Sequence, residues 1–444
     1  MHNRTLDLLE QAGCQIDHAK QMACFPPTLV MEQVKQAPSS FNLGARDKKH
    51  DLEIGNGDVH TRCISGCFKI LDYPTGHCRT GTTLDCAKSA LLQDSLENVK
   101  LVAGLLYPFD VPPALRTITL LRQTLENSAK HIFLNVFGGQ ELNYLLQMLL
   151  VLVDKKTLAQ RPLLSVNVTP VSPLTYSEDQ LDVLFTAAEH GLPIQFGSTP
   201  ITGASAPITL AGQLSLIHAE ILAGVVISQI IKPGSPAIYE PRPNTMDLRN
   251  ANVLWGSIEW GITSSASKQL AELVALPADL SGATTESKTT DQQAAIEKAM
   301  NLSLIALSKP SIISGLGQLE TINTASFEQL VIDSEICGMM YRVLKGIDVN
   351  EDTLATELIQ RIGPGGSFLG ERHTLDFYGN EHYLPTIFDR QIRENWVEAG
   401  EKDITAVASE KVQQLVANHR PVPLDPGTLK ELDSICTQAK DELL

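Results

Sequence analysis

Residues 163–198 read LLSVNVTPVSPLTYSEDQLDVLFTAAEHGLPIQFGS, which is one complete strand, helix and strand unit. The short apolar runs Leu163–Thr169 and Pro193–Ser198 are typical of buried strands. Between them, Ser177–His190 has the apolar spacing of an amphipathic helix and begins with a serine followed by acidic residues. Because a crossover helix of this length joins strands that run parallel, the stretch predicts a parallel βαβ unit.

The same alternation of short strands and longer helices continues along most of the chain. Core strands are predicted at Val59–Ser65, Val99–Tyr107, His131–Phe137, Leu163–Thr169, Pro193–Ser198, Pro236–Glu240, Leu276–Ser281 and Ser311–Gly315. Helices are predicted between them at Leu84–Leu96, Pro113–Glu126, Gln140–Leu152, Ser177–His190, Ile208–Ile231, Ser257–Leu273 and Thr290–Ala306. Eight strands close a (β/α)8 barrel of the TIM type, which is the α/β fold we expect. A doubly wound open sheet is the alternative, and it is disfavoured because no Gly-x-Gly-x-x-Gly follows an early strand.

Helical extensions are expected on both sides of the barrel, which divides the chain into three regions. Residues 1–50 form an N-terminal helical extension, residues 51–325 the barrel, and residues 326–444 a C-terminal helical region packed on the barrel. Helices in the extensions are predicted at Thr5–Gln11, Pro27–Ala37, Phe327–Gly346, Thr353–Ile362, Ile404–Asn418 and Pro426–Leu443. An extended, aromatic-rich segment is predicted at Ser367–Trp396, and a hairpin around Tyr73-Pro74-Thr75-Gly76.

The composition is that of an ordinary globular protein, with 43% hydrophobic and 19% charged residues among 444. The formal net charge of −16 disfavours binding to nucleic acid, because a surface that acidic repels phosphate. It suits a cationic substrate or a basic protein partner. No uncharged apolar run is long enough to span a membrane, and the first residues lack the apolar stretch of a signal peptide. We therefore expect a cytoplasmic protein.

Five side chains that can bind metal lie close together in the sequence: Cys63, Cys67, His77, Cys78 and Cys86. The two-residue spacing of a zinc knuckle is missing, and no second tight pair follows. We therefore expect no metal site and interpret the four cysteines as small buried apolar side chains. The alternative is a barrel enzyme that uses zinc in this cluster to activate a thiol.

The C-terminal ends of the strands select the candidate site, because barrel enzymes build their sites there. These positions are rich in aromatic rings and carboxylates, a combination that holds quaternary ammonium groups. The candidate substrate-binding residues are Tyr107, Asp110, Phe137, Tyr239, Glu240, Arg242, Gln318 and Glu320. No catalytic residue is assigned, since the sequence has no Gly-x-Ser-x-Gly, His-Glu-x-x-His or phosphate-binding motif.

Two of these candidates lie two positions apart in the segment Ile238-Tyr239-Glu240-Pro241-Arg242-Pro243. Glu240 is expected to help hold a cationic head group, and Arg242 to face the carboxylate of a betaine-type substrate. The alternative is that the two residues pair with each other, because residues two apart on a strand share a face.

Several ordered segments carry a resemblance to a known family. They are Asn167–Leu174, Thr202–Gly212, Ala219–Gly224, Ser287-Lys288 with Asp291–Ala294, Ser326–Ile336, Gly363–Gly370 with His373-Thr374, and the flanking Ala45-Arg46-Asp47 and Pro421–Pro426. In these segments, and from about residue 3 to the end, the chain resembles the trimethylamine methyltransferase (MttB-like) family.

The resemblance implies a barrel enzyme that passes a methyl group from a methylated amine to a corrinoid (cobalamin) carried by a partner protein docked over the barrel mouth. No cofactor is expected to be bound tightly by this chain itself. The resemblance also implies that members acting on trimethylamine carry a pyrrolysine near Ser281–Lys288, whereas this chain has only standard residues there. The expected substrate is therefore a small quaternary amine such as glycine betaine.

Two departures from the family pattern leave an alternative function open. The loop after the first strand reads Cys63-Ile64-Ser65-Gly66-Cys67-Phe68 and is less glycine-rich than the family pattern, and the N-terminal region is shorter near Lys20–Phe25. The alternative is a family member without turnover that binds betaines or a corrinoid protein. Assembly of identical copies is also left open by the sequence.

Overall fold

Eight parallel strands form the centre of the computed structural model, which describes residues 2–444. They are β5 (His60–Cys63), β8 (Leu101–Ala103), β9 (His131–Asn135), β10 (Leu164–Val168), β11 (Ile194–Ser198), β12 (Ala237–Pro241), β15 (Asp279–Ser281) and β16 (Ile312–Leu316). Each strand pairs with the next in chain order, and β16 pairs with β5. A single parallel bridge between Tyr239 and Ala278 joins β12 to β15 and closes the barrel. The predicted fold and all eight predicted strands are confirmed.

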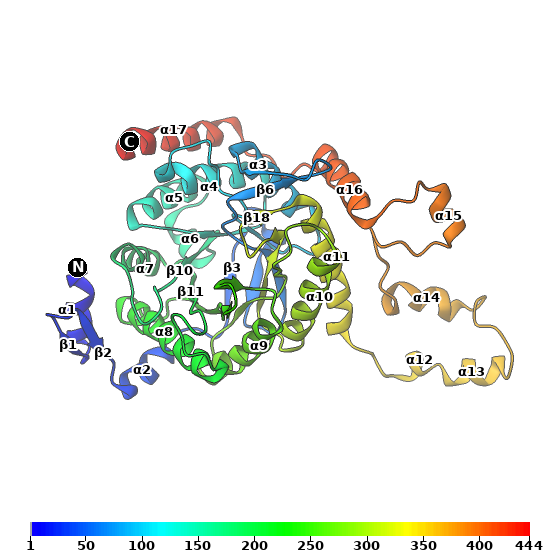
Figure 1. Ribbon diagram of the computed structural model, residues 1–444, viewed down its shortest axis with the longest axis horizontal. Coiled ribbons are helices and arrows are strands. Elements are labelled where there is room, and N and C mark those ends of the chain that lie inside the picture. The colour runs from blue at the N-terminus through cyan, green and yellow to red at the C-terminus, as the bar shows by residue number, and fades with distance from the viewer. Residues whose placement is uncertain (1) are drawn as a thin grey trace.

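A ring of helices surrounds the barrel, one after each strand (Figure 1). They are α3 (Thr83–Ser95), α4 (Arg116–Asn127), α5 (Gly139–Leu152), α7 (Glu178–His190), α8 (Leu210–Ile231), α9 (Ile258–Leu273), α10 (Gln292–Leu307) and α11 (Phe327–Lys345). The start of α7 shows why these helices were visible in the sequence, since the Ser177 side chain accepts a hydrogen bond from Gln180 N and Gly191 ends the helix in a left-handed conformation. The last helix, α11, packs on β16 and α10 and so takes the eighth place in the ring.

Short elements in the loops extend the barrel at its two ends. The predicted hairpin is present as β6 (Lys69–Asp72) and β7 (His77–Thr80), and it joins β17 (Gln318–Leu319) and β18 (Thr324–Ala325) in a four-stranded sheet. A second hairpin, β13 (Thr245–Asp247) and β14 (Asn252–Leu254), follows β12. The remaining short helices in the barrel are η2 (Pro113–Leu115) and α6 (Lys155–Gln160).

The N-terminal extension is only partly helical, so its prediction needs correction. Both predicted helices are present, as α1 (Asn3–Gln11) and α2 (Pro27–Val34). The residues around them form two hairpins instead, β1 (Gln15–Asp17) with β2 (Met22–Cys24), and β3 (Phe41–Leu43) with β4 (Leu52–Ile54), the latter pair connected through η1 (Lys48–His50). Leu43 and Ile54 of the second hairpin are buried against Leu101, Ile238 and Ile312, and they close the N-terminal end of the barrel.

The C-terminal region divides into helices that pack on the barrel and helices that do not. The helices α16 (Ile404–Asn418) and α17 (Pro426–Leu443) have the predicted bounds, and they pack on α11 and on α3, α4 and α5. The predicted helix Thr353–Ile362 is two helices, α12 (Glu351–Leu354) and α13 (Thr356–Ile362), separated at the left-handed Ala355. The extended segment predicted for Ser367–Trp396 is wrong in part, because it contains α14 (Arg372–Glu381) and α15 (Arg393–Glu398). Figure 1 shows α12 to α15 standing away from the barrel.

One helix, α8, is long and apolar enough to cross a membrane by length and composition alone. In this fold it is one of the barrel helices, and half of its apolar window is buried inside the protein, with α2 packed over it. Burial against the barrel therefore accounts for its apolar character. The division of the chain into three regions stays a prediction.

Candidate functional site

A cavity of about 120 Å³ lies at the C-terminal ends of the barrel strands. Its wall is formed by Arg62, Ile64, Ser65, Phe133, Asn135, Asn167, Thr169, Gly197, Thr199, Glu240, Arg242, Trp255 and Ile322. An engineered cavity of about 150 Å³ is known to admit benzene, so this volume suits a small molecule of a few heavy atoms. The position agrees with the general rule for barrel enzymes.

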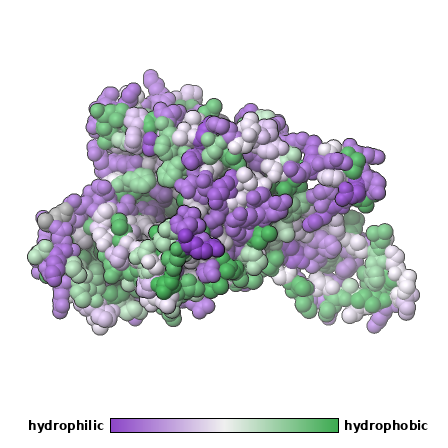
Figure 2. Space-filling view, in the orientation of Figure 1, coloured by the Kyte–Doolittle hydropathy of each residue, from purple (hydrophilic) through white to green (hydrophobic). Residues whose placement is uncertain are grey.

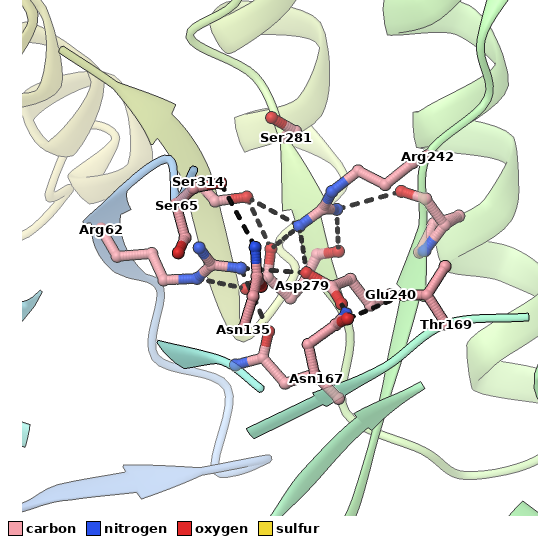
Figure 3. Close-up of polar contacts among 12 residues, drawn as sticks. Arg62, Ser65, Asn135, Asn167, Thr169, Glu240, Arg242, Asp279, Ser281 and Ser314 are labelled. Atoms are coloured by element: carbon pink, nitrogen blue, oxygen red, sulfur yellow. Dashed lines mark hydrogen bonds and ion pairs between the residues drawn. The ribbon is translucent and has the colours of Figure 1, made fainter. Parts of the chain in front are cut away.

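Four buried charged side chains form the floor of this cavity (Figure 3). Arg62 donates from Nε to Asp279 Oδ2 at 2.7 Å and from Nη2 to Glu240 Oε1 at 3.0 Å. Arg242 donates from Nη2 to the same Glu240 oxygen at 2.5 Å and to Asp279 Oδ1 at 3.1 Å. Figure 3 shows the two guanidinium groups approaching the carboxylates from opposite sides. The two positive and two negative charges therefore balance within the barrel.

The surroundings of the four charges explain why they can be buried. The guanidinium of Arg62 lies 3.8 Å from the centre of the Phe133 ring, and its Nη2 also donates to Gln195 Oε1. Arg242 donates from Nη1 to two backbone carbonyls, those of Pro241 and Asp279, and from Nη2 to Ser314 Oγ. Since its donors are occupied in this way, Arg242 is held rigidly and is not free to swing toward a ligand.

The two carboxylates of the floor differ in their pKa. Burial raises the pKa of Glu240 above its usual value, and the neighbouring charge of Asp279 adds to the rise, although Arg242 and Arg62 oppose it. Burial would also raise the pKa of Asp279, but the charges of Arg62 and Arg242 lower it below its usual value. Asp279 is therefore the carboxylate that stays ionised to lower pH.

An aromatic wall stands beside the charged floor. Trp255 lines the cavity and stacks on Trp260, with ring centres 4.7 Å apart. Trp260 is fully buried, and its Nε1 donates to Ser281 O at 2.6 Å. The backbone N–H of Trp255 donates to the Glu286 carboxylate, which fixes the loop after β14. The indole of Trp255 is therefore held in place and presents an aromatic surface to the cavity.

A group of polar side chains without full hydrogen bonding lies next to the cavity. Ser65 and Tyr107 are both buried, and their hydroxyls lie near each other and near Asn135 without a well-formed hydrogen bond among the described residues. Asn135 lies beside them, and its Nδ2 makes a long contact of 3.4 Å with Ser65 O. Burial raises the pKa of the Tyr107 phenol, so it stays protonated and able to donate. Buried polar groups normally have hydrogen-bond partners, so these donors are available to a ligand that supplies an acceptor.

The structure brings some of the predicted site residues together and separates others. Glu240 and Arg242 line the cavity, and they pair with each other as the alternative interpretation expected, although inside the barrel. Tyr107 lies behind the wall, and Phe137 is 58% exposed at the mouth, with its ring 6.0 Å from the Tyr107 ring. Tyr239 does not face the mouth as expected. Its hydroxyl points into the helix layer and contacts His218 Nδ1 on α8 at 3.1 Å.

Three further candidates hold the structure of the mouth loops. Asp110 Oδ1 accepts hydrogen bonds from the backbone and hydroxyl of Thr83 at the start of α3. Gln318 is buried and accepts a hydrogen bond from Ile322 N, which places Ile322 in the cavity wall. Glu320 accepts from Thr324 Oγ1 at 2.7 Å. A role of these three residues in substrate binding stays a prediction.

Sequence reasoning missed several residues of the site altogether, among them Arg62, Asn135 and Asp279. A charged residue inside a strand was the available signal for Arg62 and Asp279, because an ion in a barrel strand needs a buried partner. That partner could not be read from the sequence, since the two residues are far apart along the chain.

The cysteine cluster does not form a ligand set. No group of three or more histidine, cysteine, aspartate or glutamate side chains that could hold a metal ion occurs within residues 2–444. Cys63, Cys67 and Cys86 are buried in the core, as predicted, and burial raises the pKa of the Cys86 thiol to about 12. Cys78 is exposed, so the interpretation of all four cysteines as buried side chains is wrong for this one.

Comparison with known proteins gives a consistent result over the whole chain. The family model described as trimethylamine methyltransferase (MTTB) matches residues 1–443. Trimethylamine methyltransferase MttB of Methanosarcina barkeri is 34% identical, covering 97% of this chain and 88% of its own. The glycine betaine methyltransferase of Desulfitobacterium hafniense is 30% identical, covering 100% of this chain and 96% of its own. Among solved structures, the monomethylamine methyltransferase of Methanosarcina barkeri matches with a TM-score of 0.51 at 11% identity, covering 99% of this chain and 87% of that chain, which shows the fold.

The charge balance of the floor can be tested by Asp279→Asn. Loss of this charge leaves two buried guanidinium groups with one carboxylate, so we expect the free energy of unfolding to fall by about 3–5 kcal/mol. Urea denaturation measures the change, and the exposed Asp376→Asn is the control, expected to alter stability by less than about 0.5 kcal/mol. An Asp279 variant as stable as the control would contradict the interpretation of the four charges as one balanced network.

Proposed function

The chain belongs to the trimethylamine methyltransferase family and is a methyltransferase, and from this premise we propose that it transfers a methyl group from a quaternary amine of the glycine betaine type to a corrinoid protein. The observation that carries the proposal is the make-up of the cavity. One part of its wall offers the indole face of Trp255, and another offers Ser65 and Asn135, with the Tyr107 hydroxyl behind them. A betaine has a cationic head and a carboxylate, and the two parts match these two groups.

The cationic head is expected at Trp255. An aromatic face attracts a quaternary ammonium group through its quadrupole, by about 0.5–2 kcal/mol depending on desolvation. The floor carboxylates add a negative charge nearby, although Glu240 is already paired with both arginines. Glu240 therefore contributes to the electrostatic potential in the cavity and does not form a direct ion pair with the substrate.

The carboxylate is expected at Ser65, Tyr107 and Asn135. All three offer hydrogen-bond donors, and the buried hydroxyls of Ser65 and Tyr107 make no well-formed hydrogen bond that a ligand would have to displace. A carboxylate that accepts such hydrogen bonds binds more strongly than a neutral acceptor. This assignment replaces the expected role of Arg242, whose donors are taken by the floor.

The chemistry of a quaternary amine fits the residues present. A quaternary nitrogen leaves as a neutral tertiary amine, so breaking its bond to the methyl carbon needs no proton. The described residues of the cavity wall include no histidine, cysteine or lysine that could serve as a general acid near neutral pH. The chain would accelerate the reaction by holding the methyl group in line with its acceptor and excluding water.

The corrinoid is a reactant carried by a second protein, and it supplies a cobalt(I) ion whose electron pair forms the new bond to the methyl carbon while the C–N pair leaves with the amine. The mouth of the barrel offers a surface for that protein. Exposed apolar side chains surround it on the loops after five strands, namely Phe68, Phe137, Val171, Leu174, Ile208 and Leu248. We call these six residues the mouth ring, and an exposed apolar patch of this kind marks an interaction site.

The loops that carry the mouth ring are held by buried contacts. Glu220 on α8 is fully buried, and its carboxylate accepts hydrogen bonds from Leu174 N, Ser172 Oγ and Ser198 Oγ. The loop after β10 is therefore fixed against α8 and β11. A docking surface fixed before binding loses less entropy when its partner arrives.

The substrate class is tested by demethylation of a panel of amines with free cob(I)alamin. We expect glycine betaine to react much faster than trimethylamine, because unprotonated trimethylamine would have to release a dimethylamide anion, which is a poor leaving group. Dimethylglycine formed from glycine betaine, or dimethylamine formed from trimethylamine, measures the rate. Equal or reversed rates would exclude the quaternary amine as the substrate, and betaine binding without demethylation would favour the alternative of a protein that only binds.

The carboxylate side is tested by Ser65→Ala and Tyr107→Phe. Each variant removes one donor to the substrate carboxylate, and such a bond contributes about 1.5–3 kcal/mol, or roughly 10- to 100-fold in KM for glycine betaine. The KM for tetramethylammonium, which lacks a carboxylate, should stay unchanged. Tyr378→Phe, at an exposed position, is the matched control. A parallel loss for both substrates would mean that the hydroxyls do not bind the carboxylate.

The mouth ring is tested by Phe137→Glu and Leu174→Glu. A charge at either position should weaken docking of a corrinoid protein, so transfer to the protein-bound corrinoid should fall at least about fivefold, as expected for interface positions that cost more than about 1 kcal/mol. Transfer to free cob(I)alamin should persist, because the cavity is unchanged. Met22→Glu, on the N-terminal hairpin, is the control. If both rates fell together, the ring would belong to the substrate site instead of the docking surface.

A further inference from the structure

Residues 347–403, which we call the arm, leave the end of α11 and return at the start of α16 (Figure 1). The four helices of the arm bury no side chain. Large apolar side chains are exposed along it instead, among them Leu369 at 86% and Leu375 at 80%. Figure 2 shows hydrophobic residues gathered on the arm at the right of the molecule. Exposed apolar surface of this extent marks an interaction site.

The arm is fixed at its middle, so it is not a loose tail. The carboxylate of Glu335 on α11 is buried and accepts hydrogen bonds from Tyr383 Oη at 2.7 Å and from Thr386 N at 3.0 Å. Ile387 is buried in the core beside them, and Arg342 donates to Glu381 O. The arm is thus held at Tyr383–Ile387, while apolar side chains elsewhere along it, such as Leu369 and Leu375, have no cover from its own barrel.

A second uncovered apolar surface lies on the barrel flank formed by α9, α10 and α11. On α10, Ile296, Met300 and Leu307 are all more than half exposed, and their spacing places them on one stripe of the helix. All sixteen residues of α10 are described, and its two charged side chains are not part of this stripe. Lys298 is buried on Asp333, and Glu297 accepts a hydrogen bond from Thr285.

The stripe continues onto the neighbouring helices. Leu273 on α9 and Val343 on α11 are strongly exposed, and α9 and α11 both pack against α10. The outer face of a barrel helix normally carries charged or polar side chains. We call the five residues Leu273, Ile296, Met300, Leu307 and Val343 the flank stripe, and its lack of charge indicates that another surface covers it.

The charge of the arm selects this stripe as its partner surface. The arm contains twelve acidic and five basic residues, and the whole chain has a net charge of −16. Most of the surface of another copy would therefore repel it, whereas the uncharged flank stripe does not. Both uncovered surfaces belong to the same chain, so one symmetric pairing covers both twice.

We propose that the arm of one copy lies on the flank stripe of a second copy, and the arm of the second on the first, to form a closed dimer. The contacts are isologous, because each copy gives an arm and receives one. None of the five residues of the flank stripe lines the cavity or belongs to the mouth ring, so the dimer uses neither of them. The proposal does not depend on the substrate or on turnover.

The test measures the mass of the purified full-length chain by sedimentation equilibrium. We expect the unchanged chain to be a dimer, or a larger assembly of such dimers, at micromolar concentration. Leu369→Glu with Leu375→Glu on the arm, and Ile296→Glu with Met300→Glu on the stripe, should each give a folded monomer by circular dichroism. Met31→Glu on α2 is the control and should leave the mass unchanged. A monomeric unchanged chain, or an assembly that resists both pairs of substitutions, would refute the proposal.

Mixing the two monomeric variants tests whether the arm of one copy contacts the flank stripe of the other. A mixed pair keeps one intact contact, the unchanged arm of the stripe variant on the unchanged stripe of the arm variant. The mixture should therefore regain dimers, at higher concentration than the unchanged chain requires. Pairing of arm with arm or of stripe with stripe would leave one of the variants dimeric on its own, and that result would overturn the assignment.

Discussion

The closure of the barrel depends on the four buried charges of its floor. Seven of the eight joins between neighbouring strands are ladder pairings, but β12 and β15 share only the isolated bridge between Tyr239 and Ala278. Arg242, which follows β12, reaches across this join to the backbone and the carboxylate of Asp279 on β15. Arg62 binds the same two carboxylates from β5 on the far side. An isolated ion is costly to bury without a partner. The strands β5, β12 and β15 therefore have to pack side by side in the barrel for any of the four charges to be buried with its partners.

The mutual pairing of the four charges also determines which groups of the cavity can bind a ligand. The arginines that look available to an anionic ligand are used in the floor, and Glu240, which looks available to a cation, is paired twice. What is left for a ligand is the Trp255 face and the donors of Ser65 and Asn135 in the wall, with Tyr107 behind them. A ligand that is neutral overall but carries separated charges suits a site with a balanced floor, since it adds no net charge to the barrel interior.

The fold was predictable because each strand and each helix leaves a recognisable pattern in its own short stretch of sequence. The eight strands are apolar runs between helices with clear caps, such as Ser177 and Ser326, and those patterns do not depend on distant residues. The site was predictable only in part. The alternation of side chains along β12 makes Glu240 an inward residue and so turns Tyr239 outward, a step that the sequence allowed but the aromatic argument overrode. Arg62 and Asp279 depend on each other across the closed barrel, and no local pattern reveals such a pair. The strands of the N-terminal hairpins were not predicted, because they are too short to show the alternation of apolar and polar residues that marks a strand.

Two of the exposed apolar surfaces of the molecule, the mouth ring and the flank stripe, need different explanations. The mouth ring is carried by loops around the cavity, which a protein bringing a reactant to that cavity has to contact. The flank stripe lies on the outer faces of barrel helices, from which no reacting atom can be reached. A partner on the flank can therefore serve assembly but not transfer. If the arms of an assembled pair lie on the flanks, each mouth is left free, and two cavities can exchange methyl groups with separate carriers at the same time. The separation of the surfaces is thus a physical condition for an enzyme that has to be assembled and still accept a large second reactant.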